Sequence, residues 1–146
     1  MQQKRFRYVP HTADAAFVAR GGSFKAAFES AALALLSLML DQDKIKGAAG
    51  RIKTVRMTDK ASSREELVWF VLQDILSKVD ERKLNAFGFK INRLSEEGAI
   101  FKVNGCIFYK DSGVDSALMS VKAVTPHGLK VRKTGKAYTI RVVVDV

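Results

Sequence analysis

The sequence is poor in cysteine, with one residue of this type, Cys106, among 146. An internal disulfide is therefore excluded, and nothing indicates an oxidising compartment. Cys106 stands in the apolar run GCIFY, where a buried small hydrophobic side chain is favoured over a nucleophile.

The sequence also lacks a signal peptide and any apolar run long enough to cross a bilayer. Residues 31–40, AALALLSLML, form the longest candidate, and a membrane-spanning helix needs about 20 residues. We therefore expect a cytoplasmic protein that makes no contact with a membrane.

Motifs that hold a nucleotide or build a nucleophile are missing as well. Neither a GxGxxG nor a GxxxxGK[ST] loop is present to bind phosphates. The two histidines, His11 and His127, lie far apart beside prolines, and no Ser–His–Asp arrangement can be assembled. These absences favour a protein that is not an enzyme.

Positive charge is what the sequence has in excess, with 25 lysines and arginines against 15 acids and a formal net charge of +10. Such an excess indicates a polyanionic partner, and RNA or DNA is the obvious class. The cations are scattered through the chain, as on an ordinary solvated surface, so the charge locates no binding site. Two short groups stand near the ends of the sequence: Lys4, Arg5 and Arg7, and Lys130, Arg132, Lys133 and Lys136.

Two segments have the apolar spacing of buried helices. The first covers residues 24–40 and follows Ser23, which is a suitable N-cap residue. The second follows Ser63 and Glu66, which form a capping box, and its apolar stripe runs from Leu67 to Val79.

The remaining segments have the pattern of strands. Residues 5–9, 15–19 and 51–57 are predicted strands, and everything after Asn85 reads as a meander of hairpins. Residues 87–94, 99–110, 117–125, 129–133 and 137–146 form its strands, with a bulge predicted at Gly105 and a tight turn at 126–128. We expect a single domain, residues 1–146, of the α+β class, in which two helices pack on one face of a mostly antiparallel mixed sheet.

Two stretches carry candidate functional side chains. YVPHTADAAF places His11, Thr12 and Asp14 between two predicted strands, where functional residues often lie. His11 is also compatible with a turn after Pro10, and Thr12 or Asp14 with a local side-chain-to-backbone turn. The segment RVVVDV, at the other end of the sequence, sets Asp145 beside Val146 on a strand.

Four segments follow one another in the order and spacing typical of archeases: PHTAD, GSFKAAFESAALALLSLM, SREELVWFVLQDIL and SVKAVTPHGLKV with the final VVVDV. The sequence resembles this family over essentially its whole length. Archeases are small α+β proteins that assist the RtcB-type RNA ligase in tRNA splicing. The resemblance therefore implies an activator that speeds the GTP- and metal-dependent guanylylation of the ligase and sustains its turnover.

The resemblance also implies site residues. Archeases hold a divalent metal between the aspartate of HTAD and the C-terminus, which corresponds to Asp14, Asp145 and the carboxylate of Val146. The lysine of VKA, here Lys122, is implicated in activating the ligase. Pro126 stands where archeases usually carry an aromatic residue.

Elementary electrostatics agrees with a metal at such a site. Two carboxylates about 4 Å apart repel by about 4 kcal/mol at an effective dielectric constant of 20. They are therefore expected to bind a cation or to have a raised pKa. Oxygen ligands suit Ca²⁺, Mn²⁺ or Mg²⁺, whereas Zn²⁺ would be favoured if His11 or His127 joined them.

Two other functions are compatible with the sequence. A basic RNA-binding module, or a chaperone for tRNA or a tRNA-modifying enzyme, predicts salt-sensitive RNA binding that is independent of Asp14 and Asp145. An independent metal-dependent hydrolase would need a nucleophile or general base, and none is evident. Residues 5–9 could also pair between subunits of a homo-oligomer.

Overall fold

The two long helices form where the apolar spacing predicts them. The computed structural model describes residues 5–9 and 14–146 of the chain. Helix α1 spans Phe24–Met39 and helix α3 spans Arg64–Arg82. The other elements are β1 (Phe6–Val9), β2 (Ala15–Gly21), α2 (Gln42–Gly47), β3 (Arg51–Ala61), β4 (Asn85–Glu97), β5 (Ile100–Asp111), β6 (Ala123–Thr134) and β7 (Ala137–Asp145).

Both helix starts are capped as expected. The hydroxyl of Ser23 accepts a hydrogen bond from the Ala26 N–H at 3.0 Å. The hydroxyl of Ser63 accepts one from the Glu66 N–H at 3.1 Å. The return bond of the predicted capping box is displaced by one residue, because the Glu66 carboxylate accepts from the N–H and hydroxyl of Ser62.

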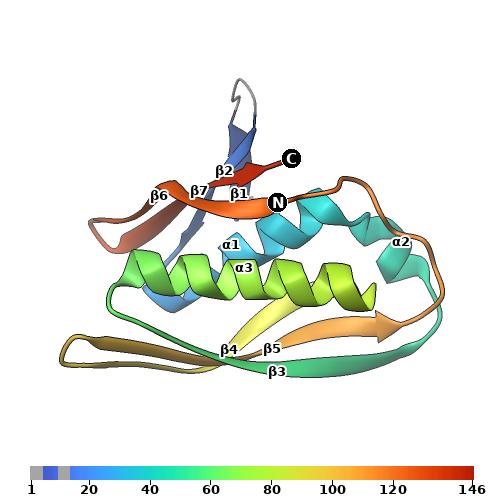
Figure 1. Cartoon of the computed structure of the whole chain (residues 1–146), viewed down its shortest axis with the longest axis horizontal. Helices are drawn as coiled ribbons and strands as arrows, with labels where there is room; N and C mark the ends of the chain where they lie inside the picture. The colour runs from blue at the N-terminus through green and yellow to red at the C-terminus, as the bar shows by residue number, and fades with distance from the viewer. Residues whose placement is uncertain (1–4, 10–13) are drawn as a thin grey trace.

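The strands form two antiparallel sheets, with orders β1-β2-β7-β6 and β3-β5-β4. Figure 1 shows α1 and α3 lying in a layer between them. Helix α1 packs on β2, β7 and β4, and α3 packs on β6, β3 and β5. The predicted α+β class is confirmed, but the single mixed sheet becomes two sheets, and every described strand pair is antiparallel.

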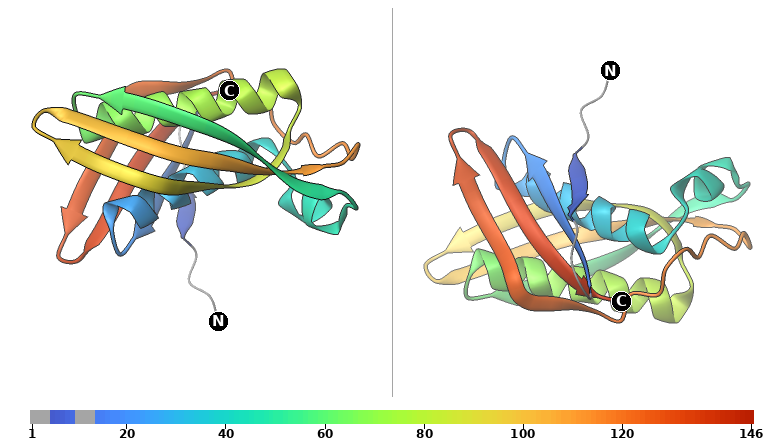
Figure 2. Two further views of the ribbon diagram at one scale, coloured as in Figure 1. Left: turned by 90° about the horizontal axis from the view of Figure 1, so that it is seen from below. Right: turned by 90° about the horizontal axis from the view of Figure 1, so that it is seen from above.

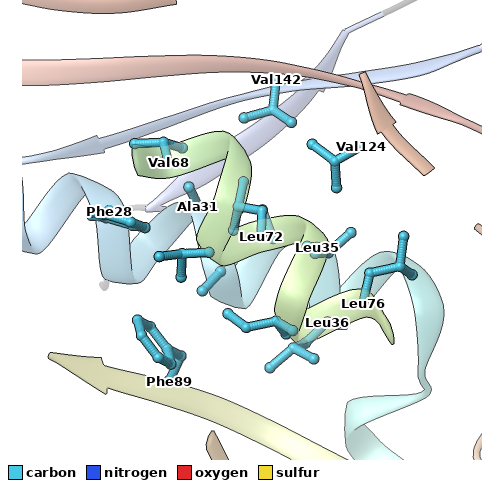
Figure 3. Close-up of a cluster of buried hydrophobic side chains, with 14 of the residues drawn as sticks. Phe28, Ala31, Leu35, Leu36, Val68, Leu72, Leu76, Phe89, Val124 and Val142 are labelled. Carbon is cyan, nitrogen blue, oxygen red and sulfur yellow. The ribbon is translucent and has the colours of Figure 1, made fainter. Parts of the chain in front are cut away.

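The core lies on both sides of the helix layer. Figure 3 shows Phe28, Leu35 and Leu72 of the two helices packed between side chains of opposite sheets, such as Phe89 and Val142. Because each helix is covered by a sheet on either side, its apolar stripe is wide. This explains why the stripe of α3 includes seven buried residues: Leu67, Val68, Val71, Leu72, Ile75, Leu76 and Val79.

Several local predictions were wrong. Residues 117–122 form no strand apart from an isolated bridge between Ala117 and Leu40. The predicted turn at 126–128 lies inside β6, where the pairing with β7 is irregular and Gly128 has φ +80°. The short helix α2 was not foreseen, because its six residues bury only Ile45 and its apolar pattern is too short to read.

Gly105 lies in β5 opposite Ile91, and the extra residues of the ladder are in β4. The glycine is needed for a different reason from the predicted bulge. A Cβ atom at this position would lie 2.5 Å from the Phe89 ring, so the absence of a side chain lets the ring pack on the strand. Cys106, next to it, is half-buried and accepts a hydrogen bond from the Asn92 amide at 3.4 Å.

Within the described part of the chain, no helix is long and apolar enough to cross a membrane.

Candidate functional site

Three strand ends meet at one end of the first sheet, the one with the order β1-β2-β7-β6. Strands β2 and β6 start here and β7 ends here, and this end of the sheet is called the sheet edge in the account of the site. In the ladder between β2 and β7, Ala15 pairs with Val144. Asp14 precedes Ala15, and Asp145 follows Val144. Neighbouring strands lie about 4.8 Å apart, so this register continued by one residue sets Asp14 beside Asp145.

The start of β6 lies on the other side of Asp145. Ala123 pairs with Asp145, and the main-chain N–H of Lys122 donates to the Asp145 carbonyl at 2.7 Å. Lys122, Asp145 and Val146 are all exposed at this edge. Residues separated by more than 100 positions along the chain are therefore neighbours here.

The arrangement offers oxygen ligands and one ammonium group. Two carboxylates on adjacent strands suit a hard divalent cation, which takes oxygen ligands and retains open positions for water or a partner. Over residues 5–9 and 14–146, no group of three or more histidine, cysteine or acidic side chains is placed to hold a metal. The side-chain donor set in this part of the chain is thus limited to the two aspartates, which leaves coordination incomplete.

In the described part of the chain, the structure places no histidine among these residues. His11 and Thr12 lie outside the described residues, so their predicted roles stay predictions. His127 is exposed in the irregular part of β6, and its carbonyl accepts a hydrogen bond from the Thr125 hydroxyl at 3.0 Å. Its predicted position after Pro126 is therefore within a strand irregularity and not at a turn between strands.

Two residues of α3 that sequence reasoning missed hold the start of β6. The indole N–H of Trp69 donates to the Val124 carbonyl at 2.8 Å. The side-chain oxygen of Gln73 accepts from the Val124 N–H at 2.9 Å. These side chains fix the main chain two residues from Lys122. The available signal was their spacing of four residues at the margin of the apolar stripe, which places them on one face of the helix.

Known proteins resemble this chain along nearly all of its length. Residues 6–146 match the model of the Archease protein family (MTH1598/TM1083). The protein archease of Methanosarcina acetivorans is 29% identical over 149 residues, covering 99% of this chain and 98% of that protein. The protein archease of Sulfolobus acidocaldarius is 31% identical over 146 residues, covering 97% and 99% respectively.

Solved structures have the same fold. The solution structure of Methanobacterium thermoautotrophicum protein 1598 superposes with a TM-score of 0.80 at 25% identity, covering 99% of this chain and all of that one. An archease from Thermotoga maritima superposes with a TM-score of 0.58 at 22% identity, covering 94% of each chain, which bears on the fold alone. With the family model matching all but the first five residues, the chain belongs to the archease family.

Proposed function

We propose that this protein activates an RtcB-type RNA ligase in the cytoplasm by promoting guanylylation of the ligase, and that it performs no catalysis itself. The observation that carries the proposal is the strand register, because Ala15 pairs with Val144 and Ala123 with Asp145, which supports placing Asp14, Asp145 and Lys122 close together where these strands end. Membership of the archease family supports the choice of partner.

The two aspartates and the main-chain carboxylate of Val146 would hold a divalent metal, Ca²⁺, Mn²⁺ or Mg²⁺. The chemistry of the donors supports this, because all three are oxygen ligands of the type these hard cations take. A bound metal would supply a positive charge at the sheet edge with coordination positions open toward a partner. The protein's contribution is to hold the carboxylates on strand ends that β-sheet hydrogen bonds keep in place.

Lys122 would act toward the ligase and its phosphate-bearing substrate. Its main chain is fixed by the hydrogen bond to Asp145, while its side chain is exposed. An ammonium group on a flexible stem suits a phosphate oxygen or an acidic side chain of the partner. The fixed backbone limits the region that this ammonium group reaches to the edge that also bears Asp145.

The test is ligase guanylylation measured with and without the protein, in the wild type and in three variants: Asp14→Ala, Asp145→Ala and Lys122→Ala. We expect acceleration by the wild type and its loss in each variant. Matched controls remove the same chemical groups elsewhere. Asp80→Ala and Lys25→Ala change exposed residues of the two helices and should leave acceleration unchanged.

Retained acceleration in all three variants, with folding confirmed by circular dichroism, would contradict the proposed site. No acceleration by the wild type would contradict the proposed function itself. Loss in Lys122→Ala alone would limit the working group to the lysine and make the metal incidental.

A further inference from the structure

The outer face of the first sheet carries an array of cations that are far apart along the sequence. We name as the basic face six residues of β1, β2, β6, β7 and the residue preceding β1: Arg5, Arg7, Arg20, Lys130, Arg132 and Arg141. Arg5 and Arg7 from the first basic group of the sequence, and Lys130 and Arg132 from the second, are thus parts of one surface. Figure 2 (right) shows this sheet in front of the helix layer.

Strand register arranges the cations in two rows. Arg7 pairs with Val18, Val18 with Arg141, and Arg141 with Lys130, so one row crosses all four strands. In the next row, the Arg20 N–H donates to the Arg5 carbonyl at 2.9 Å. That row continues through Thr139, which pairs with both Arg20 and Arg132.

Burial of the alternate residues fixes which way these rows face. Phe17 and Ala19 flank Val18 and are fully buried against the helices, as are Ile140 and Val142 on either side of Arg141. Side chains alternate along a strand and cross-strand partners share a face. The basic face therefore points away from the helix layer, toward solvent.

Nothing on these strands neutralises the array. The only acid in β1, β2, β6 and β7 is Asp145, which stands at the sheet edge. Among the described residues, no ion pair involves any of the six cations. Lys130 lies directly opposite Arg141, and like charges opposite each other destabilise a sheet. An anion with several charges would relieve that repulsion.

We propose that the basic face binds the phosphate backbone of RNA. With about 4.8 Å between strands, the four-stranded row spans about 14 Å, and the rows lie roughly 7 Å apart. This array presents cations to several successive phosphates at once. Five of its six cations are arginines, which carry the planar guanidinium group that binds phosphate through two parallel hydrogen bonds: Arg5, Arg7, Arg20, Arg132 and Arg141.

The choice of RNA over an acidic protein rests on the proposed function, in which the partner ligase works on RNA. The position of the face supports that choice. It belongs to the sheet whose edge bears Asp145 and Lys122, so a ligase at the edge and an RNA on the face would occupy neighbouring surfaces.

The experiment measures binding of a fluorescently labelled RNA stem-loop to the full chain by anisotropy, without ligase, between 50 and 200 mM salt. Six phosphate contacts predict an affinity loss of roughly a thousandfold over this range. A face variant carries Arg7→Gln, Arg20→Gln, Lys130→Gln and Arg132→Gln. A control variant makes the same change in charge on the outer face of the β3-β5-β4 sheet: Lys60→Gln, Lys90→Gln, Arg93→Gln and Lys102→Gln.

We expect the face variant to lose most of its affinity at 50 mM salt and to reduce the slope of log K against log salt by about 3 to 4. The control variant and Asp14→Ala should bind like the wild type. The last comparison separates RNA binding from ligase activation, because Asp14→Ala is expected to fail only in guanylylation.

Equal weakening of the two quadruple variants would overturn the proposal, since net charge and not this face would then govern binding. So would the absence of RNA binding by the wild type at 50 mM salt. Tighter binding of poly-glutamate than of the stem-loop, lost in the face variant, would assign the face to an acidic protein instead. A thermal melt of the face variant guards against unfolding, and removal of the Lys130–Arg141 repulsion should not lower its midpoint.

Discussion

At the scale of single residues, the most unusual ionisable group is Asp59 of β3. One of its carboxylate oxygens is buried with no hydrogen-bond partner among the described residues. Burial, and then the nearby charge of Asp74 on α3, raise the pKa of Asp59 from about 3.8 to about 6. The Nζ atom of Lys78 forms an ion pair with Oδ1 of Asp74 at 2.5 Å. Among the described residues, Asp59 has no such cation paired with its buried oxygen, so it is the carboxyl group that takes up a proton.

Asp59→Asn should therefore stabilise the protein above pH 6. The raised pKa means that the folded state binds more protons than the unfolded state between about pH 4 and pH 6, so the wild type loses stability as the pH rises through this window. Partial exposure of Asp59 screens the effect, which we expect to be about 1 kcal/mol at pH 8 and absent at pH 3.5.

Urea unfolding of both proteins at the two pH values measures this. An Asp59→Asn variant that is less stable than the wild type at pH 8 would show that the ionised carboxylate is favourably bound in the native state.

At the scale of elements, side chains of each long helix form hydrogen bonds with main-chain groups of an edge strand. Strand β4 is an edge strand, and the Glu29 carboxylate of α1 accepts a hydrogen bond from its Ile91 N–H at 2.8 Å. Strand β6 is the edge of the other sheet, and Trp69 and Gln73 of α3 bind its Val124 main chain. Edge strands expose unpaired main-chain groups, and these contacts cover them. Strand β1, another edge, carries the residues predicted to pair between subunits, and that pairing stays a prediction.

Gln73→Leu should weaken both the fold and the candidate site. The change leaves the Val124 N–H without its acceptor, which costs about 1–3 kcal/mol for a buried donor. Because Val124 lies two residues after Lys122, we expect ligase guanylylation to be stimulated less even at temperatures where the variant is folded.

Chemical denaturation and the guanylylation assay, run on the same preparation, check the two parts of this expectation. Glu81→Leu, a change at an exposed position of the same helix, is the matched control and should affect neither. Unchanged stability of Gln73→Leu would mean that water replaces the lost acceptor.

At the scale of the whole molecule, the proposed metal connects β2 to β7, which are the second and last strands of the chain. A ligand that binds the folded state alone stabilises it in proportion to the logarithm of its concentration. Ca²⁺, Mn²⁺ or Mg²⁺ at about 100 times its Kd should thus add about 2.7 kcal/mol. For a chain of this size, that raises the melting temperature by roughly 5–10 °C.

Calorimetry with and without each cation measures the shift. Asp14→Ala and Asp145→Ala should abolish it, whereas Asp80→Ala should not. An equal shift in all three variants would place the cation elsewhere on the molecule.

The sequence by itself determined the elements with strong local signals. Ser23 and Ser63 cap helices as predicted, because a cap depends on residues within one turn. The stripe from Leu67 to Val79 is buried, since a spacing of three to four residues puts its members on one side of a helix. The motif resemblance likewise identified the family and nominated the site residues, whose roles stay proposals.

Only the tertiary structure decided which strands pair, because pairing energies depend on residues far apart in the sequence. Such distant partners decide the division into two sheets and the path of residues 117–122. They also decide the hydrogen bonds of Trp69 and Gln73 with the main chain of Val124. The basic face is the clearest case. Arg7 and Lys130 are separated by most of the chain, and a ladder of four strands brings them into one row that no sequence window contains.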